Sequence, residues 1–149
     1  MPEAHKWDLR FLGMAKLVAS WSKDPSTQTG AVITRPDRTI ASVGYNGFAR
    51  GCDDNPSLYA NRPVKYAKII HCEMNAILAS REPLLGYALI VWPFLTCDRC
   101  AVHVIQSGIK YVVAPVCPSH LKERWEETFV RARQYYREAG VEVNEIDFA

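Results

Sequence analysis

The sequence predicts an α/β fold with a partly parallel sheet that helices cover on both faces. Two short apolar runs separated by a turn come early in the chain, and strands alternate with helices in the second half. The helical segments carry their apolar residues along one side. Such alternation is typical of parallel strands joined by crossover helices, with both faces of the sheet buried.

The first half of the chain predicts a helix, a hairpin and a long loop. Residues 7–23 show helical apolar spacing, and Pro25 follows the expected end of the helix. AVIT (31–34) and TIASVG (39–44) flank a turn-like RPDR and predict a β-hairpin. Residues 45–69 contain several glycines and prolines and predict a loop that acts as a lid or binding loop. The apolar stripe of the helix consists of Trp7, Phe11, Met14, Val18 and Trp21.

The second half predicts three helices and three strands in alternation. In chain order they are a helix over 71–81, a buried strand over 87–92, a helix over 97–107, a strand over 110–114, an amphipathic helix over 119–139 and a strand over 141–146. The inward side of the long helix is expected to carry Leu121, Trp125, Phe129, Ala132 and Tyr136. We find no repeat or linker and expect one domain over residues 1–149.

Composition narrows the class of protein. The 149 residues suit one domain, and a hydrophobic content of 48% indicates a globular chain. A net charge of +2 without a Lys/Arg run gives no sign of a nucleic-acid partner. The sequence has neither a membrane span nor an apolar signal core, so we expect a cytoplasmic protein. Five cysteines, an odd number, argue against a disulfide framework.

Two motifs carry candidate metal ligands. TCDRC (96–100) places Cys97 and Cys100 three residues apart, so their side chains share one face of a first helical turn. Helix N-terminal amides favour thiolates there, although a CxxC pair alone also fits a redox role or a structural zinc site. HCEMNAIL (71–78) adds His71 at the start of another expected helix. One histidine and two cysteines leave one tetrahedral position of zinc open, as a catalytic site requires.

Glu73 separates a catalytic from a structural zinc site. Residues two apart do not share a helix face, so His71 and Glu73 can converge only near the helix tip. A carboxylate beside the metal is placed to move protons. The alternative is a first-turn carboxylate that the helix dipole favours. Cys72, between the two, is expected to point away from both and to pack in the core.

H-x-E with a later C-x-x-C is the signature of zinc nucleobase deaminases. Over residues 7–114 the chain resembles the cytidine/deoxycytidylate deaminase family, through WSKDPSTQTGAVI, GYNGFARGCDD, HCEMNAIL and CDRCAVHVIQSGIKYVV in order and spacing. The resemblance implies a cytidine deaminase-like three-layer α/β/α fold with a five-stranded mixed sheet. It also implies a zinc ion held by His71, Cys97 and Cys100, with Glu73 as the proton shuttle.

Two positions depart from the family's pattern. Thr96 stands where a proline usually precedes the first cysteine, and Ala49 stands where a loop proline usually follows GYNGF. Threonine is an acceptable helix cap, so we expect Thr96 to cap the helix that carries the cysteines. Alanine in place of proline leaves the unfolded loop freer. Neither position supplies a metal ligand.

Three further residues are candidates for substrate binding. The resemblance makes Asn46 a sugar or base contact, whereas its Asn-Gly pair also fits a plain turn. Lys23 and Arg50 flank the matching motifs and are candidates for a 5′-phosphate contact, with a solvated surface charge as the alternative. Three basic residues of the same loop region compete for that role: Arg62, Lys65 and Lys68.

The activity that the resemblance implies is hydrolytic deamination of dCMP to dUMP and ammonia, with Zn²⁺ as cofactor, by a homo-oligomer. One alternative is a deaminase of the same fold that acts on a nucleoside, a free base or a base in RNA. SKDPST and GYNG, with the near-neutral charge, favour a mononucleotide. The other alternative is a non-enzymatic zinc-stabilised binding module, which predicts a filled fourth coordination position and a dispensable Glu73.

Overall fold

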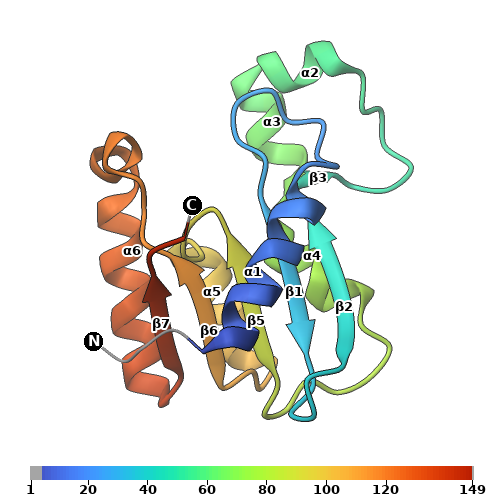
Figure 1. The fold of residues 1–149 in the computed structure, drawn as a ribbon. Helices are drawn as coiled ribbons and strands as arrows, with labels where there is room; N and C mark the ends of the chain where they lie inside the picture. Colours follow the sequence, from blue (N-terminus) through green and yellow to red (C-terminus); the bar gives the residue numbers. More distant parts are fainter. Residues whose placement is uncertain (1–4, 149) are drawn as a thin grey trace.

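The computed structural model describes residues 5–148 and contains a five-stranded mixed sheet (Figure 1). Its order is β2-β1-β5-β6-β7; β1 pairs antiparallel with β2 and β5, whereas β5, β6 and β7 run parallel. The strands are β1 (Gly30–Thr34), β2 (Ile40–Tyr45), β5 (Ala88–Trp92), β6 (Tyr111–Pro115) and β7 (Glu142–Ile146). All five correspond to strands that the sequence predicts, so the mixed sheet is confirmed.

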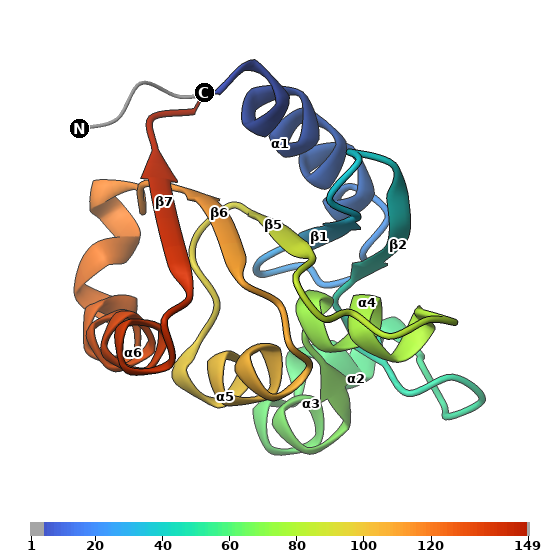
Figure 2. The same cartoon turned by 90° about the horizontal axis from the view of Figure 1, so that it is seen from below.

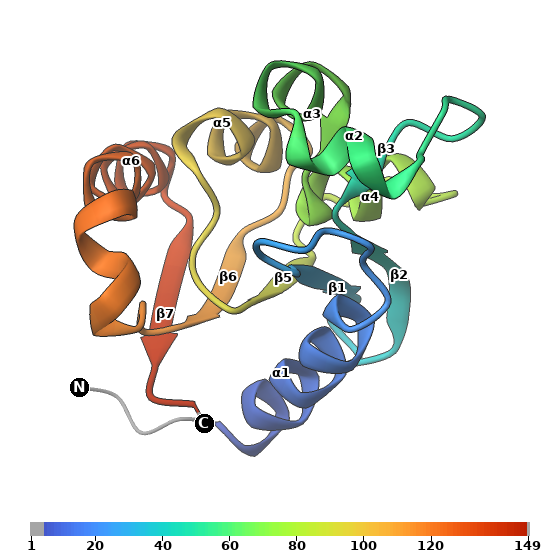
Figure 3. The ribbon, with the colours of Figure 1, turned by 90° about the horizontal axis from the view of Figure 1, so that it is seen from above.

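Helices cover both faces of this sheet. Helix α1 (Lys6–Ala19) lies alone on one face, whereas α4 (Cys72–Ala79), α5 (Asp98–Gln106) and α6 (Ser119–Ala139) lie together on the other (Figures 2 and 3). The core accordingly has two parts, because alternate side chains of each strand face opposite ways. Val32, Ile90 and Val113 pack toward α1, while Ile33, Leu89 and Val112 pack toward the other three helices. The expected three-layer α/β/α architecture is confirmed.

A glycine brings α4 close to the sheet. At Gly44 of β2, an added Cβ would lie 2.5 Å from the Cys72 carbonyl oxygen and closer still to the Ala76 amide nitrogen. Only a residue without a side chain therefore allows this approach of the two backbones. Because Cys72 lies in the first turn of α4, the contact also fixes where that helix begins.

The expected loop over residues 45–69 is wrong in part, because the segment contains short elements. They are β3 (Gly47–Phe48), α2 (Pro56–Ala60), α3 (Arg62–Lys68) and β4 (Ile69–Ile70). Asn55 and Asn61 cap the two helices, each accepting a hydrogen bond from a first-turn amide, and a proline is the first residue of α2 and the second residue of α3. β3 pairs with β4, and Phe48 stacks on Tyr59 at 4.0 Å between ring centroids. The prolines and asparagines that suggest a loop thus serve as helix starts.

The first helix ends earlier than its apolar stripe predicts. α1 stops at Ala19, and the Ser20 hydroxyl donates to the Leu17 carbonyl oxygen. Trp21, expected on the inward stripe, lies beyond the helix end with 54% exposure and meets Tyr45 edge-on. The remaining helix and strand ends lie within two residues of the expected ones. Among the described residues, no helix combines the length and apolar character needed to cross a membrane.

Candidate metal centre and active-site cavity

Two helix starts meet at one end of the sheet and carry the expected ligands. His71 is the N-cap of α4 and follows β4, while Cys97 is the N-cap of α5 and follows the turn after β5. The Cys97 sulfur accepts a hydrogen bond from the Cys100 amide at 3.4 Å, which brings both cysteines onto one side of the first turn. Thr96 is therefore not the cap. Its buried hydroxyl lies 2.6 Å from the Tyr136 hydroxyl of α6 instead.

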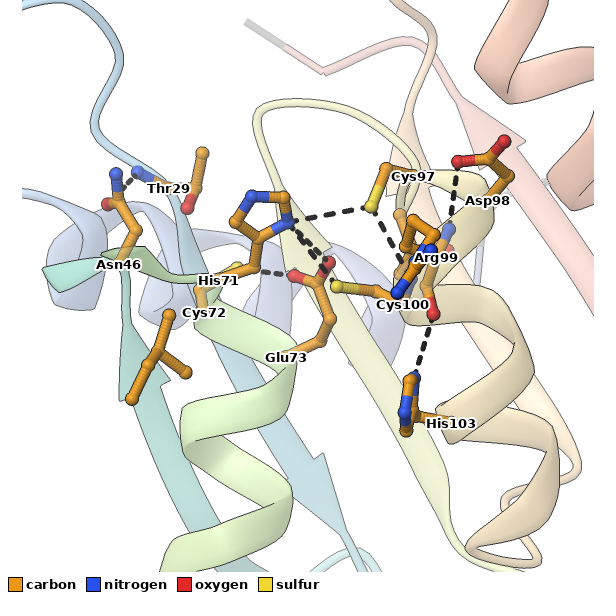
Figure 4. Close-up of polar contacts among 12 residues, drawn as sticks. Thr29, Asn46, His71, Cys72, Glu73, Cys97, Asp98, Arg99, Cys100 and His103 are labelled. Atoms are coloured by element: carbon orange, nitrogen blue, oxygen red, sulfur yellow. Dashed lines mark hydrogen bonds and ion pairs between the residues drawn. The ribbon is translucent and has the colours of Figure 1, made fainter. Parts of the chain in front are cut away.

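The four candidate side chains converge (Figure 4). The His71 Nδ1 atom lies 3.5 Å from the Cys97 sulfur and 3.3 Å from the Cys100 sulfur. Glu73 Oε1 lies 4.0 Å from the same nitrogen. One ligand atom from each of the four residues lies within 4.8 Å of all the others. Within residues 5–148 no second group of three or more such side chains forms, so Cys52 and Cys117 take no part in a further metal site.

The donor set fits zinc. Zn–S bonds of about 2.3 Å and Zn–N bonds of about 2.0 Å at a tetrahedral angle place sulfur and nitrogen about 3.5 Å apart, close to the distances found here. Two sulfurs and one imidazole nitrogen suit this borderline-soft ion better than magnesium or calcium, which prefer oxygen ligands. His71, Cys97 and Cys100 are thus disposed to hold one metal ion, with the Glu73 carboxylate directly beside it.

Interactions within the cluster decide where its protons lie. The hydrogen bond with Cys97 raises the pKa of His71 to about 9. The pKa of Cys97 falls to about 5, first because Cys100 donates to its sulfur and then because His71 does. The same interaction with Cys97, together with burial, raises the pKa of Cys100. Without a metal the cluster therefore holds protons on His71 and Cys100 at neutral pH, and a metal ion displaces them.

Three of the four converging residues, His71, Glu73 and Cys97, line a cavity of about 110 Å³. Its apolar wall comes from the turn after β5 and from α6, and consists of Phe94, Trp125 and Phe129. Phe94 thus lies at the cavity, whereas Trp92 packs toward α1 on the opposite face of the sheet. Arg124 of α6 also lines the cavity, with its guanidinium 5.1 Å from the Trp125 ring centroid.

The cavity also has a polar wall, which holds Asn46. This side chain is buried, and its Oδ1 atom accepts from the Thr29 amide at 2.9 Å. Its Nδ2 atom donates to the Thr27 carbonyl oxygen at 2.9 Å and to Asp24 Oδ2 at 3.2 Å. Asn46 therefore orders residues 24–29 as well as lining the cavity, so the turn role and the binding role expected for it are compatible.

Asp24 joins the same wall to α3. Its carboxylate pairs with the Lys65 ammonium at 2.9 Å, and both side chains are largely buried at 4% and 14% exposure. Asp24 also accepts from the Ser26 amide at 2.8 Å. The ion pair neutralises Lys65, which leaves Arg124 as the cation of the cavity wall without an ion-pair partner among residues 5–148.

Lys23 and Arg50 do not line the cavity. The Lys23 ammonium forms an exposed ion pair with Asp54 at 2.6 Å, and Arg50 is exposed on the loop after β3. Asp24 and Arg124 line it instead. A signal for Asp24 lies in the DPST sequence, where aspartate can order a turn by accepting from the amide two residues on. The sequence contains no local signal for Arg124, because α6 meets the cavity only through the folding of the sheet.

A five-stranded mixed sheet with histidine and CxxC ligands at two helix starts, and a carboxylate beside them, defines the class of zinc-dependent nucleobase deaminases. Comparison with known proteins gives the family. Residues 5–116 match the model described as cytidine and deoxycytidylate deaminase zinc-binding region. The chain therefore belongs to the cytidine and deoxycytidylate deaminase family.

Individual relatives agree with this assignment. The "Uncharacterized deaminase in luxG 3'region" of Aliivibrio fischeri is 45% identical over 138 residues, which cover 93% of this chain and 92% of that protein. The deoxycytidylate deaminase of Mus musculus is 33% identical over 141 residues, 91% of this chain and 77% of that protein. A solved structure, the dCMP deaminase of cyanophage S-TIM5, covers 97% of this chain with a TM-score of 0.72 at 19% identity, which confirms the fold.

Proposed function

We propose that the protein is a zinc-dependent deaminase that converts dCMP to dUMP and ammonia. The observation that carries the proposal is the position of the Glu73 carboxylate, which is buried at 4% exposure, lies beside three zinc-type ligands and lines a cavity. Membership of the family and likeness to a relative named deoxycytidylate deaminase support the choice of substrate.

His71, Cys97 and Cys100 would hold the metal in this proposal. Zinc, when bound, supplies a Lewis acid that lowers the pKa of water toward neutrality. Hydrolysis adds one water at C4 of cytosine and releases ammonia. Glu73 carries the protons: it takes one from the water, delivers it to N3 and then helps protonate the leaving amine. Its burial keeps bulk water from competing for these transfers.

The substrate would lie between the apolar and the polar wall. Phe94 and Trp125 offer flat apolar surfaces to a pyrimidine, and Asn46 offers a polar contact to the sugar or base. We propose Arg124 as the phosphate contact, because it lines the cavity and has no ion-pair partner among residues 5–148. Lys23 and Arg50 remain the sequence-based candidates for the same role.

The proposal extends to assembly and location. We propose a homo-oligomer, supported by the exposed apolar side chains of Leu78 and Val102 on the neighbouring helices α4 and α5. One deaminase domain over residues 1–149 and a cytoplasmic location complete it, since thiolate ligands persist in a reducing compartment. Light scattering of the purified protein tests the first point.

Ammonia release from dCMP, dCTP, deoxycytidine and cytosine, measured side by side, tests the activity. We expect dCMP to be preferred over deoxycytidine by well over tenfold in kcat/KM, since a contact to a charged group contributes roughly 1.5–3 kcal/mol. Equal activity on both would refute the mononucleotide assignment. No release from any substrate by zinc-loaded protein would favour the binding module.

A further inference from the structure

Cys72 does not point away from its neighbours, as helical geometry alone suggests. The side chain is buried at 1% exposure in the first turn of α4. Its sulfur lies 2.9 Å from Glu73 Oε2 and donates to it (Figure 4). Oε1, the other oxygen of this carboxylate, is the one that lies 4.0 Å from His71 Nδ1. The thiol therefore holds one oxygen while the other faces the metal ligands.

We propose that Cys72 is a positioning residue for Glu73, whose thiol fixes the carboxylate with Oε1 toward the metal. The inference rests on the proposed function, in which Glu73 moves several protons at one site. A carboxylate with this task must keep one orientation through each transfer, because proton transfer requires hydrogen-bond distance. A buried carboxylate is held in one orientation when a protein group donates a hydrogen bond to it.

Few other groups can restrain Glu73. The Cys100 sulfur also interacts with this carboxylate, but as a thiolate ligand Cys100 has no proton to donate. His71 Nδ1 lies 4.0 Å from Glu73 Oε1, which is too far for a hydrogen bond, and in the proposed function this nitrogen binds the metal. Once the metal is bound, the donor that the described residues retain for Glu73 Oε2 is the Cys72 thiol.

Substitutions of Cys72 distinguish a positioning role for Glu73 from a role in packing alone. In Cys72→Ala we expect about one zinc per chain and an unchanged KM for dCMP, with kcat lowered roughly tenfold, the usual effect of losing a partner that orients an active-site group. Cys72→Ser should regain most of kcat, because its hydroxyl also donates. Cys117→Ala removes another buried thiol and should leave kcat unchanged. A Cys72→Ala enzyme with wild-type kcat would overturn the inference, as would a Cys72→Ser enzyme no better than Cys72→Ala.

A spectroscopic measurement tests the contact without activity. The infrared S–H stretch that disappears in zinc-loaded Cys72→Ala belongs to Cys72, and it should lie at lower frequency than that of Cys117. Glu73→Ala removes the acceptor and should raise this frequency. If the wild-type enzyme deaminates dCMP but the Cys72 band has the same frequency in Glu73→Ala, this inference alone is refuted. Failure of the zinc-loaded protein to deaminate any substrate refutes the proposed function and, with it, the role of Cys72 in catalysis.

Discussion

The Thr96 hydroxyl lies 2.6 Å from the Tyr136 hydroxyl, and both groups are buried. The pair joins the residue before the first cysteine to α6, which supplies Arg124 and Trp125 to the cavity. Thr96 stands where the family usually has a proline, so this chain replaces a constraint on φ with a side-chain hydrogen bond. Burial is the first reason why the pKa of Tyr136 is raised, which keeps this phenol neutral.

Tyr136→Phe should lower the free energy of unfolding by about 1–3 kcal/mol, because it leaves the buried Thr96 hydroxyl without its partner. Chemical denaturation of the zinc-loaded protein measures this. Tyr135→Phe, at a half-buried position next in the chain, should change the value by less than about 0.5 kcal/mol. Equal effects of the two substitutions would show that the Thr96–Tyr136 contact adds no stability.

Cys97→Ser and Cys100→Ser should each reduce the zinc content from about one per chain to a small fraction, because zinc binds the thiolate and serine stays protonated. Metal analysis of protein purified in zinc-supplemented medium measures the content. Cys117→Ser changes a buried thiol outside the cluster and should retain the metal. Full zinc content in both ligand variants would show that the metal assignment is wrong.

Glu73→Gln should keep its zinc and its fold while turnover falls by several orders of magnitude. Glutamine has nearly the same shape but cannot accept and pass on a proton, and general acid–base catalysis alone contributes roughly 10²–10⁴-fold. Zinc content and single-turnover rates on dCMP are the two measurements. Loss of zinc together with activity would mean that Glu73 is a fourth ligand of a closed site, contrary to the proposed mechanism.

Arg124→Ala should narrow the preference for dCMP over deoxycytidine, mainly through a higher KM for dCMP. The expected loss in kcat/KM for dCMP is about ten- to hundredfold, corresponding to one charge-assisted phosphate contact. Lys23→Ala and Arg50→Ala test the sequence-based candidates in the same assay. If either of these two substitutions lowers kcat/KM for dCMP more than Arg124→Ala does, the phosphate contact is a surface residue and not Arg124.

Gly44→Ala should unfold the start of α4, because its Cβ would meet the backbone at Cys72 and Ala76. We expect a loss of at least about 3 kcal/mol in the free energy of unfolding, at the upper end of single-residue effects, together with weaker zinc binding. Gly13→Ala has open space around its Cβ within α1 and should stabilise by about 0.5–1 kcal/mol. Similar melting temperatures for the two variants would contradict this account.

The sequence by itself determined the five strands and four main helices, because periodicity and caps are local properties of the chain. It also predicted the convergence of His71, Glu73, Cys97 and Cys100, because the HxE and CxxC motifs place each pair of side chains at the start of a helix. Local rules failed at the end of α1, where Trp21 continues the apolar spacing but follows the last helical residue. They failed again between residues 45 and 69, where asparagine caps with prolines start α2 and α3.

Only the tertiary structure decided which side chains surround the metal ligands. Arg124 lies 51 residues after Glu73 in the chain (124 − 73), yet both line one cavity because α4 and α6 cover the same face of the sheet. Arg50 lies only 23 residues before Glu73 (73 − 50), yet it does not line that cavity, and neither does Lys23. Even the contact between the adjacent residues Cys72 and Glu73 required it, because that contact depends on side-chain rotamers, which the packing of α4 against β2 restricts.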